Sequence, residues 1–167
     1  MKHIRRLLLA LIIIALIIGA VFLCLKLQPL PGLLEQAGLP LSCVHGITDV
    51  ESFTDWLTYT DGYDYAVLRV NPKTFTPPAN WQQGSATIQE VNPAPQGLGC
   101  YDFHPDFYRN ALLPESFTHW LFIPRDSSAA FDQQEFFAGM YDGQTGILVL
   151  YRGHTFHGSC HPRFLLD

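Results

Sequence analysis

The strongest constraint on this chain is an uncharged stretch near its N-terminus, residues 7–25, which reads LLLALIIIALIIGAVFLCL. As an α-helix this stretch is about 28 Å long, which matches the hydrocarbon thickness of a bilayer. It holds fourteen Leu, Ile, Val and Phe residues. At roughly 0.4 kcal/mol each, these residues favour insertion by about 6 kcal/mol. The sequence therefore predicts a transmembrane helix over residues 7–25.

A cleaved signal peptide is the alternative for the same stretch. Signal peptides carry a shorter apolar core, of roughly 7–15 residues, and end at a small-x-small cleavage site. Residues 26–38, KLQPLPGLLEQAG, contain no convincing site of this kind, and Leu23 stands where a lipoprotein-type cut before Cys24 requires a small residue. The pattern favours an uncleaved signal-anchor.

The charges that flank the apolar stretch predict its orientation. Lys2, Arg5 and Arg6 precede it, whereas only Lys26 follows closely. Because basic residues are retained in the cytoplasm, residues 1–6 are expected there and the rest of the chain on the other side. No N-x-S/T sequon occurs. We therefore expect a single-pass protein of a bacterial inner membrane, with its C-terminal domain in the periplasm.

Composition predicts one domain beyond the membrane. We expect a Pro/Gly linker over residues 26–41 and a single extracytoplasmic domain over residues 42–167. Residues 28–167 carry six basic against fifteen acidic side chains, a formal net charge of −9. Such a charge repels phosphate backbones, which disfavours nucleic-acid binding, and it favours a neutral or basic protein as partner.

The patterns along this domain indicate an α+β fold, a mostly antiparallel sheet with one or two short helices. The clearest signal is a hairpin in which residues 135–141 and 146–151 flank the turn residues of 142–145. A helix over residues 129–140 is an alternative for the first of these strands. The other expected elements are helices at 49–59 and 104–113, strands at 65–70, 86–91 and 117–123, and a proline-rich loop over 71–99.

Three cysteines lie outside the apolar stretch, and in an oxidising compartment two of them are expected to pair. The disulfide candidates are Cys100, Cys160 and Cys43. We favour a bond between Cys100 and Cys160, because both occupy loops after expected strands. The two pairings that use Cys43 remain alternatives.

A histidine cluster near the C-terminus suggests a metal site. His154, His157, Cys160 and His161 fall within eight residues, and His104 follows Cys100 closely. Imidazole and thiolate are good ligands for zinc or copper. The spacing matches no defined metal site, and a disulfide would remove the Cys160 thiolate. We therefore predict no cofactor, and keep zinc or copper binding as the alternative to loop histidines around a disulfide.

The sequence offers no catalytic motif. Cys160 or Cys43 with a nearby histidine would make a nucleophile and base, but local signatures of cysteine peptidases are absent. The serine-hydrolase elbow, the zinc-peptidase helix, the P-loop and the dinucleotide-binding glycines are absent too. No catalytic residue is predicted, and a non-catalytic role is favoured over an enzyme.

Function is therefore predicted from topology and charge. We expect a protein-binding module of accessory, inhibitor or immunity type, tethered to the membrane and engaging an envelope or secreted protein. Trp81, in the loop TPPANWQQG, is the candidate partner-binding residue, because an aromatic side chain on an exposed loop is typical of an interface hot spot. The alternatives are a metal-binding or redox protein and a structural subunit of an envelope complex.

Overall fold

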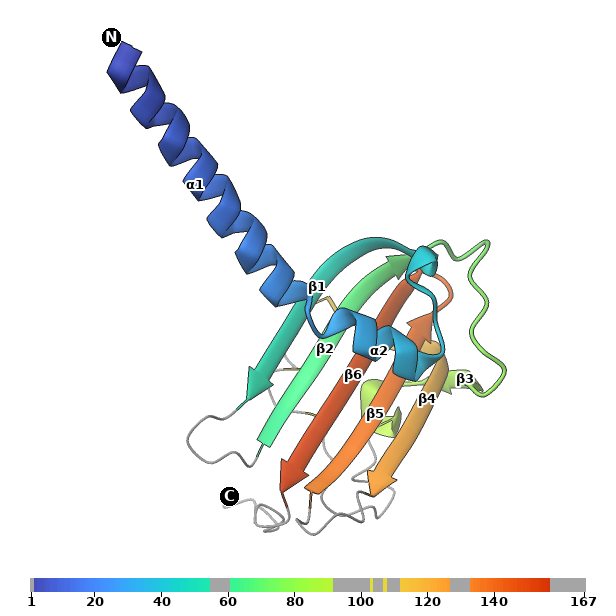
Figure 1. The fold of residues 1–167 in the computed structure, drawn as a ribbon. Helices are drawn as coiled ribbons and strands as arrows, with labels where there is room; N and C mark the ends of the chain where they lie inside the picture. Colours follow the sequence, from blue (N-terminus) through green and yellow to red (C-terminus); the bar gives the residue numbers. More distant parts are fainter. Residues whose placement is uncertain are drawn as a thin grey trace, which may run out of the picture.

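The computed structural model describes residues 2–54, 61–91, 103, 107, 112–126 and 133–156. The six strands form one sheet in the order β1-β2-β6-β5-β4-β3, and every neighbouring pair is antiparallel (Figure 1). The predicted α+β fold is confirmed. In chain order the elements are α1 (Lys2–Leu27), α2 (Leu30–Ala37), η1 (Leu41–Cys43), β1 (Val44–Thr54), β2 (Asp61–Val70), β3 (Gln82–Ala86), α3 (Ile88–Val91), β4 (Phe117–Asp126), β5 (Gln133–Asp142) and β6 (Ile147–Phe156).

Helix α1 projects away from the sheet (Figure 1). Its 26 residues make a rod about 39 Å long. Twelve large apolar side chains between Leu9 and Leu25 are 48–71% exposed. A helix that is apolar all round and lies outside the core is long and apolar enough to cross a membrane.

Helix α2 occupies the segment for which the sequence predicted a linker. Its buried residues Leu30, Leu33, Leu34 and Ala37 follow helical spacing and face the sheet. Prolines fit the first turn of a helix, where backbone N–H groups need no intrahelical acceptor. Gly38 ends α2 in the left-handed conformation, at φ 70°. The segment is therefore part of the domain core.

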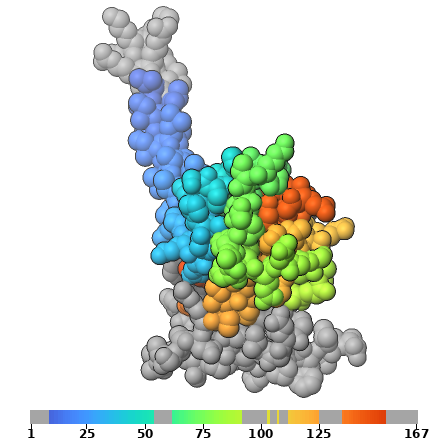
Figure 2. All heavy atoms as spheres, turned by 90° about the vertical axis from the view of Figure 1, so that its right-hand side faces the viewer, coloured from blue at the N-terminus to red at the C-terminus, as the bar shows by residue number. Residues whose placement is uncertain are grey.

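The face of the sheet that α2 covers, here called the α2 face, is also covered by the segment between β2 and β3. Trp81 at the end of this segment is 6% exposed, and its indole Nε1 donates a hydrogen bond to the Ala37 carbonyl oxygen at 3.4 Å. Figure 2 shows the segment, in green, beside α2 and η1. A Cβ atom on Gly139 would lie 2.6 Å from the Trp81 ring. Gly139 thus lets the indole lie directly on β5.

The opposite face of the sheet carries an aromatic cluster. Tyr151 lies at its centre, with ring centroids 4.7 Å from Phe107, 4.8 Å from Phe103 and 5.5 Å from Phe136. Phe103, Phe107, Phe136 and Tyr151 are all at most 1% exposed. Because both faces are covered, the central strands β2, β5 and β6 are apolar on both sides, which gives continuous apolar runs in the sequence.

The predicted hairpin is confirmed as β5 and β6. Asp142 is 7% exposed, and its carboxylate accepts hydrogen bonds from the backbone N–H groups of Gln144 and Thr145. Gly146 closes the turn at φ 72°. The alternative helix over 129–140 is wrong for the described residues 133–140, which form β5.

The helix predicted for residues 49–59 is wrong over residues 49–54, which belong to β1; residues 55–60 lie outside the described part of the chain. The pattern Thr48-x-x-Glu51 resembles a capping box. Here, however, Asp49 and Glu51 lie on one side of the strand and accept hydrogen bonds from β2, while Val50 is buried on the other side. Cross-strand bonds have replaced the expected cap.

A capping box does form where the sequence predicted a strand, at residues 86–91. Thr87 donates a backbone hydrogen bond of 2.6 Å to the Glu90 carboxylate and accepts one from the Glu90 N–H on its hydroxyl. This pair starts the short helix α3, and the strand β3 lies earlier. The hydrogen bonds from Thr87 lower the pKa of Glu90. The strand at 117–123 is confirmed within β4, and the helix at 104–113 lies largely outside the described residues.

The burial of α2 predicts a large effect of truncating Leu33, which is 0% exposed. Leu33→Ala should lower the free energy of unfolding by about 2–5 kcal/mol, because it removes a fully buried side chain and leaves a cavity. Leu41→Ala, at a 64% exposed position, is the matched control and should change it by less than about 0.5 kcal/mol. Urea unfolding of the full chain in detergent measures both. Equal effects would mean that the segment is a linker after all.

The contact between Gly139 and Trp81 predicts opposite effects for two Gly→Ala substitutions. Gly139→Ala should destabilise the fold by about 1–3 kcal/mol through overpacking. Gly32→Ala places its Cβ 3.8 Å from Arg152, an ordinary contact. It should stabilise α2 by about 0.5–1 kcal/mol, because alanine has the better helix propensity. Thermal unfolding followed by circular dichroism should show a lower melting temperature for Gly139→Ala and a higher one for Gly32→Ala.

Candidate functional site

Most residues of the predicted metal site lie outside the described part of the chain. These are His104, His157, Cys160 and His161, and the disulfide candidate Cys100 lies outside as well. The backbone of His154 is described, within β6, where it pairs with Gly62 of β2 and Glu135 of β5. Among the described residues, no three His, Cys, Asp or Glu side chains gather as a metal ion would require.

Cys43, the remaining disulfide candidate, ends η1 and precedes β1. The structure records its thiol as free and partly buried. Burial raises the pKa of the thiol, and a backbone hydrogen bond partly offsets this. A raised pKa disfavours the thiolate, so that the geometry around Cys43 does not activate it as a nucleophile.

Trp81 is not on an exposed loop, as the sequence predicted. Its ring is buried between the backbone of Gly139 and the end of α2. The exposure on which the partner-binding hypothesis for Trp81 depended is therefore absent. Pro78 of the same segment lies near the end of α2, where a Cβ atom on Gly38 would be 3.9 Å from its ring.

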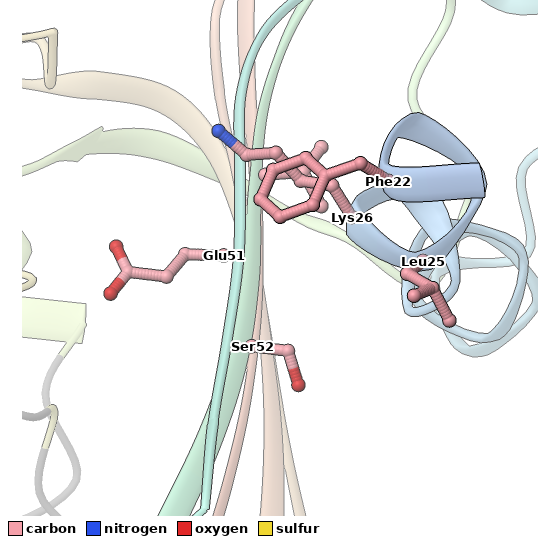
Figure 3. A pocket seen from close by; sticks show the side chains of 6 residues that line it. Phe22, Leu25, Lys26, Glu51 and Ser52 are labelled. Carbon is pink, nitrogen blue, oxygen red and sulfur yellow. The ribbon is translucent and has the colours of Figure 1, made fainter. Parts of the chain in front are cut away.

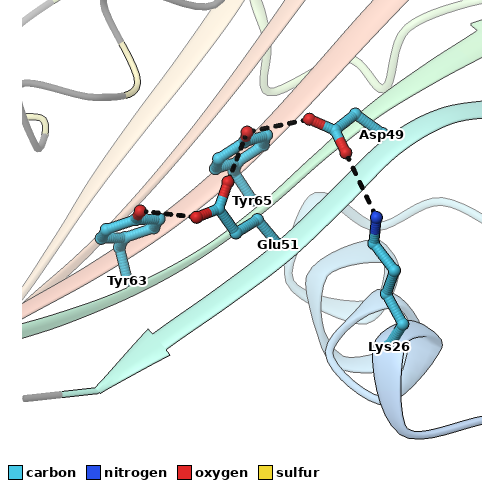
Figure 4. A network of polar contacts seen from close by, with 5 residues as sticks. All are labelled: Lys26, Asp49, Glu51, Tyr63 and Tyr65. Carbon is cyan, nitrogen blue, oxygen red and sulfur yellow. Dashed lines mark hydrogen bonds and ion pairs between the residues drawn. The ribbon is translucent and has the colours of Figure 1, made fainter. Parts of the chain in front are cut away.

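The described residues do form a polar network at the β1 edge of the sheet, on the face opposite α2 (Figure 4). The Tyr63 hydroxyl donates to one oxygen of the Glu51 carboxylate at 3.0 Å. The Tyr65 hydroxyl lies 2.8 Å from the other Glu51 oxygen and 2.9 Å from an Asp49 oxygen. A phenol has one proton, so two carboxylates share the Tyr65 donor. The two acidic side chains are therefore held in one orientation by the tyrosines of β2.

Lys26 links this network to the end of α1. Its ammonium lies 3.8 Å from the second Asp49 oxygen, and both side chains are partly exposed. An exposed ion pair of this kind contributes little stability by itself, about 0–1 kcal/mol. Its importance is geometric, because it brings the basic residue that directly follows the apolar stretch against the acidic edge of the sheet.

An open cleft lies between the last turns of α1 and the middle of β1, on the side of this strand away from the Glu51 carboxylate (Figure 3). Its volume is about 360 Å³, and apolar atoms make up most of its surface. The lining residues are Phe22, Leu25 and Lys26 from α1 and Val50, Glu51 and Ser52 from β1. Small-molecule sites begin at about 300 Å³, so this cleft is large enough for a ligand group.

A partly buried ion pair joins β2 and β6 on the α2 face. Arg152 of β6 donates two hydrogen bonds to the Asp64 carboxylate of β2, the one from Nε at 3.0 Å. The Asp64 side chain is 9% exposed and that of Arg152 is 31% exposed. Asp64 and Arg152 are direct cross-strand partners. A paired and hydrogen-bonded charge of this kind favours this register of β2 against β6, since a one-residue slip would leave the nearly buried Asp64 carboxylate without its partner.

No protein-family model matches this chain, and neither a curated protein nor a solved structure matches it. The function must therefore be argued from the described residues.

The network and the cleft were not predicted from the sequence. The available signal was the alternation in DVES and DGYDY, where acidic residues and tyrosines recur every second position. Alternation of this kind places the residues on one side of a strand. Their pairing across β1 and β2 required the strand assignment for 44–54, which the capping-box pattern obscured.

The shared hydrogen bond of Tyr65 predicts a pH-dependent stability. Burial raises the pKa of Tyr65 well above its ordinary value, and the hydrogen bonds to Glu51 and Asp49 raise it further. The folded chain therefore keeps this proton at a pH where the unfolded chain releases it. The stabilisation is complete below pH about 10 and is lost as the pH rises above it.

Tyr65→Phe should lower the free energy of unfolding by about 1–3 kcal/mol at neutral pH, because it removes a buried donor shared by two carboxylates. It should also flatten the decline in stability between pH about 10 and 11. Tyr63→Phe, which removes the hydrogen bond to one oxygen of Glu51, is the matched control and should have the smaller effect at neutral pH. Denaturant unfolding across this pH range measures both. Parallel pH profiles for wild type and Tyr65→Phe would contradict the role of this phenol.

Proposed function

We propose that this protein is a single-pass, membrane-anchored binding module. In this proposal α1 is an uncleaved signal-anchor of a bacterial inner membrane, with residues 1–6 in the cytoplasm and the sheet domain in the periplasm. The module acts without catalysis, as an accessory, inhibitor or immunity-type protein that engages an envelope or secreted protein.

The observation that carries the proposal is the direct connection of α1 to the domain core. Only Gln28 and Pro29 separate α1 from α2, and α2 begins with the buried Leu30. Leu27, the last residue of α1, itself packs against the core on the α2 face. There is no room for a small-x-small cleavage motif between the two helices, which supports an anchor over a cleaved signal. An anchor fixed in this way restricts the domain to partners at the membrane surface.

Charge supports a protein partner over a nucleic acid. With the formal charge of −9 over residues 28–167, the domain attracts neutral or basic proteins and repels polyanions. Asp49 and Glu51 add two fixed carboxylates at the β1 edge. Electrostatic attraction of this kind raises the association rate and depends on salt.

Topology can be tested with fusions to the C-terminus of the full chain. Alkaline phosphatase folds to an active enzyme in the periplasm, whereas green fluorescent protein exported by the same route stays dark. We expect an active phosphatase fusion and a dark fluorescent fusion. The matched control replaces Lys2, Arg5 and Arg6 with glutamine, which removes the positive-inside signal and should reduce phosphatase activity. A bright fluorescent fusion with an inactive phosphatase would place the domain in the cytoplasm and contradict the proposal.

Partner binding can be tested by co-purification with the full chain from detergent-solubilised membranes. We expect one envelope or secreted protein to co-purify at about 50 mM salt and to dissociate at about 500 mM, because screening weakens contacts to an acidic surface. Binding that is indifferent to salt would exclude the electrostatic contribution. A chain that co-purifies with no protein at either concentration would contradict a binding module.

A further inference from the structure

The exposed apolar side chains of the sheet domain are concentrated on η1 and β1. Beyond α1, four large apolar side chains are exposed among the residues that the structure describes. Three of them, Leu41, Ile47 and Phe53, lie on this one segment and are 42–64% exposed. The fourth is Leu112, before β4. Single exposed apolar residues need no explanation, but three along one edge strand indicate a surface that something covers.

This edge lies beside the end of α1. β1 is an edge strand of the sheet, and it runs across the direction of the α1 axis and not along it (Figure 1). The Lys26 ammonium lies 3.8 Å from an Asp49 oxygen, so the middle of β1 is level with the residue that directly follows the apolar stretch. At about 3.3 Å per strand residue, Ile47 lies about 7 Å and Phe53 about 13 Å along β1 from Asp49.

With α1 as the anchor proposed above, β1 is at the depth of the lipid headgroups. The headgroup layer on each side of the hydrocarbon is about 5–7 Å thick, and Lys26 marks the point where α1 enters it. A strand that runs across the helix axis stays close to this layer. This depth suits an edge strand, because water among the headgroups hydrates its unpaired backbone N–H and C=O groups, which the hydrocarbon could not do.

The charges of this edge permit contact with a lipid surface. The domain as a whole is acidic, which disfavours its approach to anionic lipids. Only two of its fifteen acidic residues, Asp49 and Glu51, lie within residues 41–54. Lys26 is paired with Asp49, and the exposed Arg69 of β2 lies in register with the first half of β1. Two basic side chains therefore balance the two acidic ones along this edge.

We propose that the η1–β1 edge is a contact surface for the bilayer that α1 crosses. Leu41, Ile47 and Phe53 lie in the headgroup layer, where their apolar surface is shielded from water. The contact orients the domain, so that β4 and β3, at the far side of the sheet, are directed away from the membrane. The proposal deepens the membrane-anchored function and rests on it.

The test uses the full chain in nanodiscs that contain equal amounts of phosphatidylcholine and phosphatidylglycerol. A photo-crosslinking amino acid replaces Leu41 or Ile47, and intact mass after illumination identifies each adduct. The matched control is Leu112, which is 43% exposed against 45% for Ile47 and precedes β4, four strands away from β1. Because four strand spacings amount to about 19 Å, we expect lipid adducts at positions 41 and 47 to be at least about tenfold more abundant than at position 112.

A double substitution tests whether the apolar side chains hold the edge on the bilayer. The photo-crosslinking amino acid now replaces the exposed Ser42 of η1. Leu41→Asn combined with Ile47→Asn should reduce lipid adducts at position 42 about tenfold, because the apolar surface that favours the contact is lost. Leu112→Asn is the matched control and should leave them unchanged. Circular dichroism checks that each variant keeps its sheet. Undiminished adducts in the double variant would overturn the assigned contact of these side chains.

A further crosslinking position in the middle of α1, Ile14, separates this inference from the proposed anchor. Lipid adducts at position 14 but none at positions 41 and 47 would overturn the edge contact and leave the anchor standing. Crosslinks to a second copy of the chain at positions 41 and 47 would do the same, because they would show that protein covers the edge. Equally abundant lipid adducts at position 112 would overturn the assigned orientation. A chain that gives no lipid adduct at position 14 would overturn both proposals.

Discussion

The packing of α2 on the sheet is the constraint on which the rest of this structure depends. Leu33 and Leu34 bury the α2 face of the central strands, and the Gly38 cap then turns the chain toward η1 and β1. Because α1 ends two residues before α2, the same packing also fixes where the long apolar helix leaves the domain. A flexible linker would separate folding of the domain from its attachment. Here one short helix is responsible for both, so that a loss of core packing at α2 would also release the sheet from its position beside α1.

The sheet tolerates two covered faces because small residues occur where large rings approach the backbone. Gly139 accommodates the Trp81 indole on the α2 face, and Gly153 accommodates the Phe136 ring on the other, where an added Cβ would lie 2.4 Å from it. Each glycine weakens its strand slightly, because it has more backbone entropy to lose and no side chain to pack. The buried aromatic surface offsets this, since a fully buried ring contributes about 1.5–3 kcal/mol. Each of these two glycines thus makes room for one buried aromatic ring.

The sequence predicted the fold class, the long apolar helix and the β5–β6 hairpin, because each leaves a local signal in composition or turn residues. It failed where two local signals compete. Residues 30–37 contain a proline and a glycine, as linkers often do, but their apolar residues also follow the spacing of a helix. In the structure these apolar side chains are buried and the segment is helical. Thr48-x-x-Glu51 and Thr87-x-x-Glu90 have the same capping pattern, yet only the second starts a helix. The first lies opposite Tyr63 and Tyr65, and those partners are distant in sequence. The cleft was beyond sequence reasoning for the same reason, because it forms only where α1 and β1, which are separated by α2 and η1 in the sequence, meet in the fold.

The acidic edge of the sheet has a structural consequence that is independent of any ligand. β1 lies at one end of the sheet, and a long edge strand is a template for pairing with another chain. Two register shifts interrupt its first half, between Val44 and Gly46 and between Ile47 and Asp49. The second half is regular, and there the carboxylates of Asp49 and Glu51 and the end of α1 lie beside it. Bulges, charge and a covering helix all disfavour edge-to-edge pairing. The anchoring proposed for α1 would increase the need for such protection, because tethering in the plane of a membrane raises the effective concentration of every other copy.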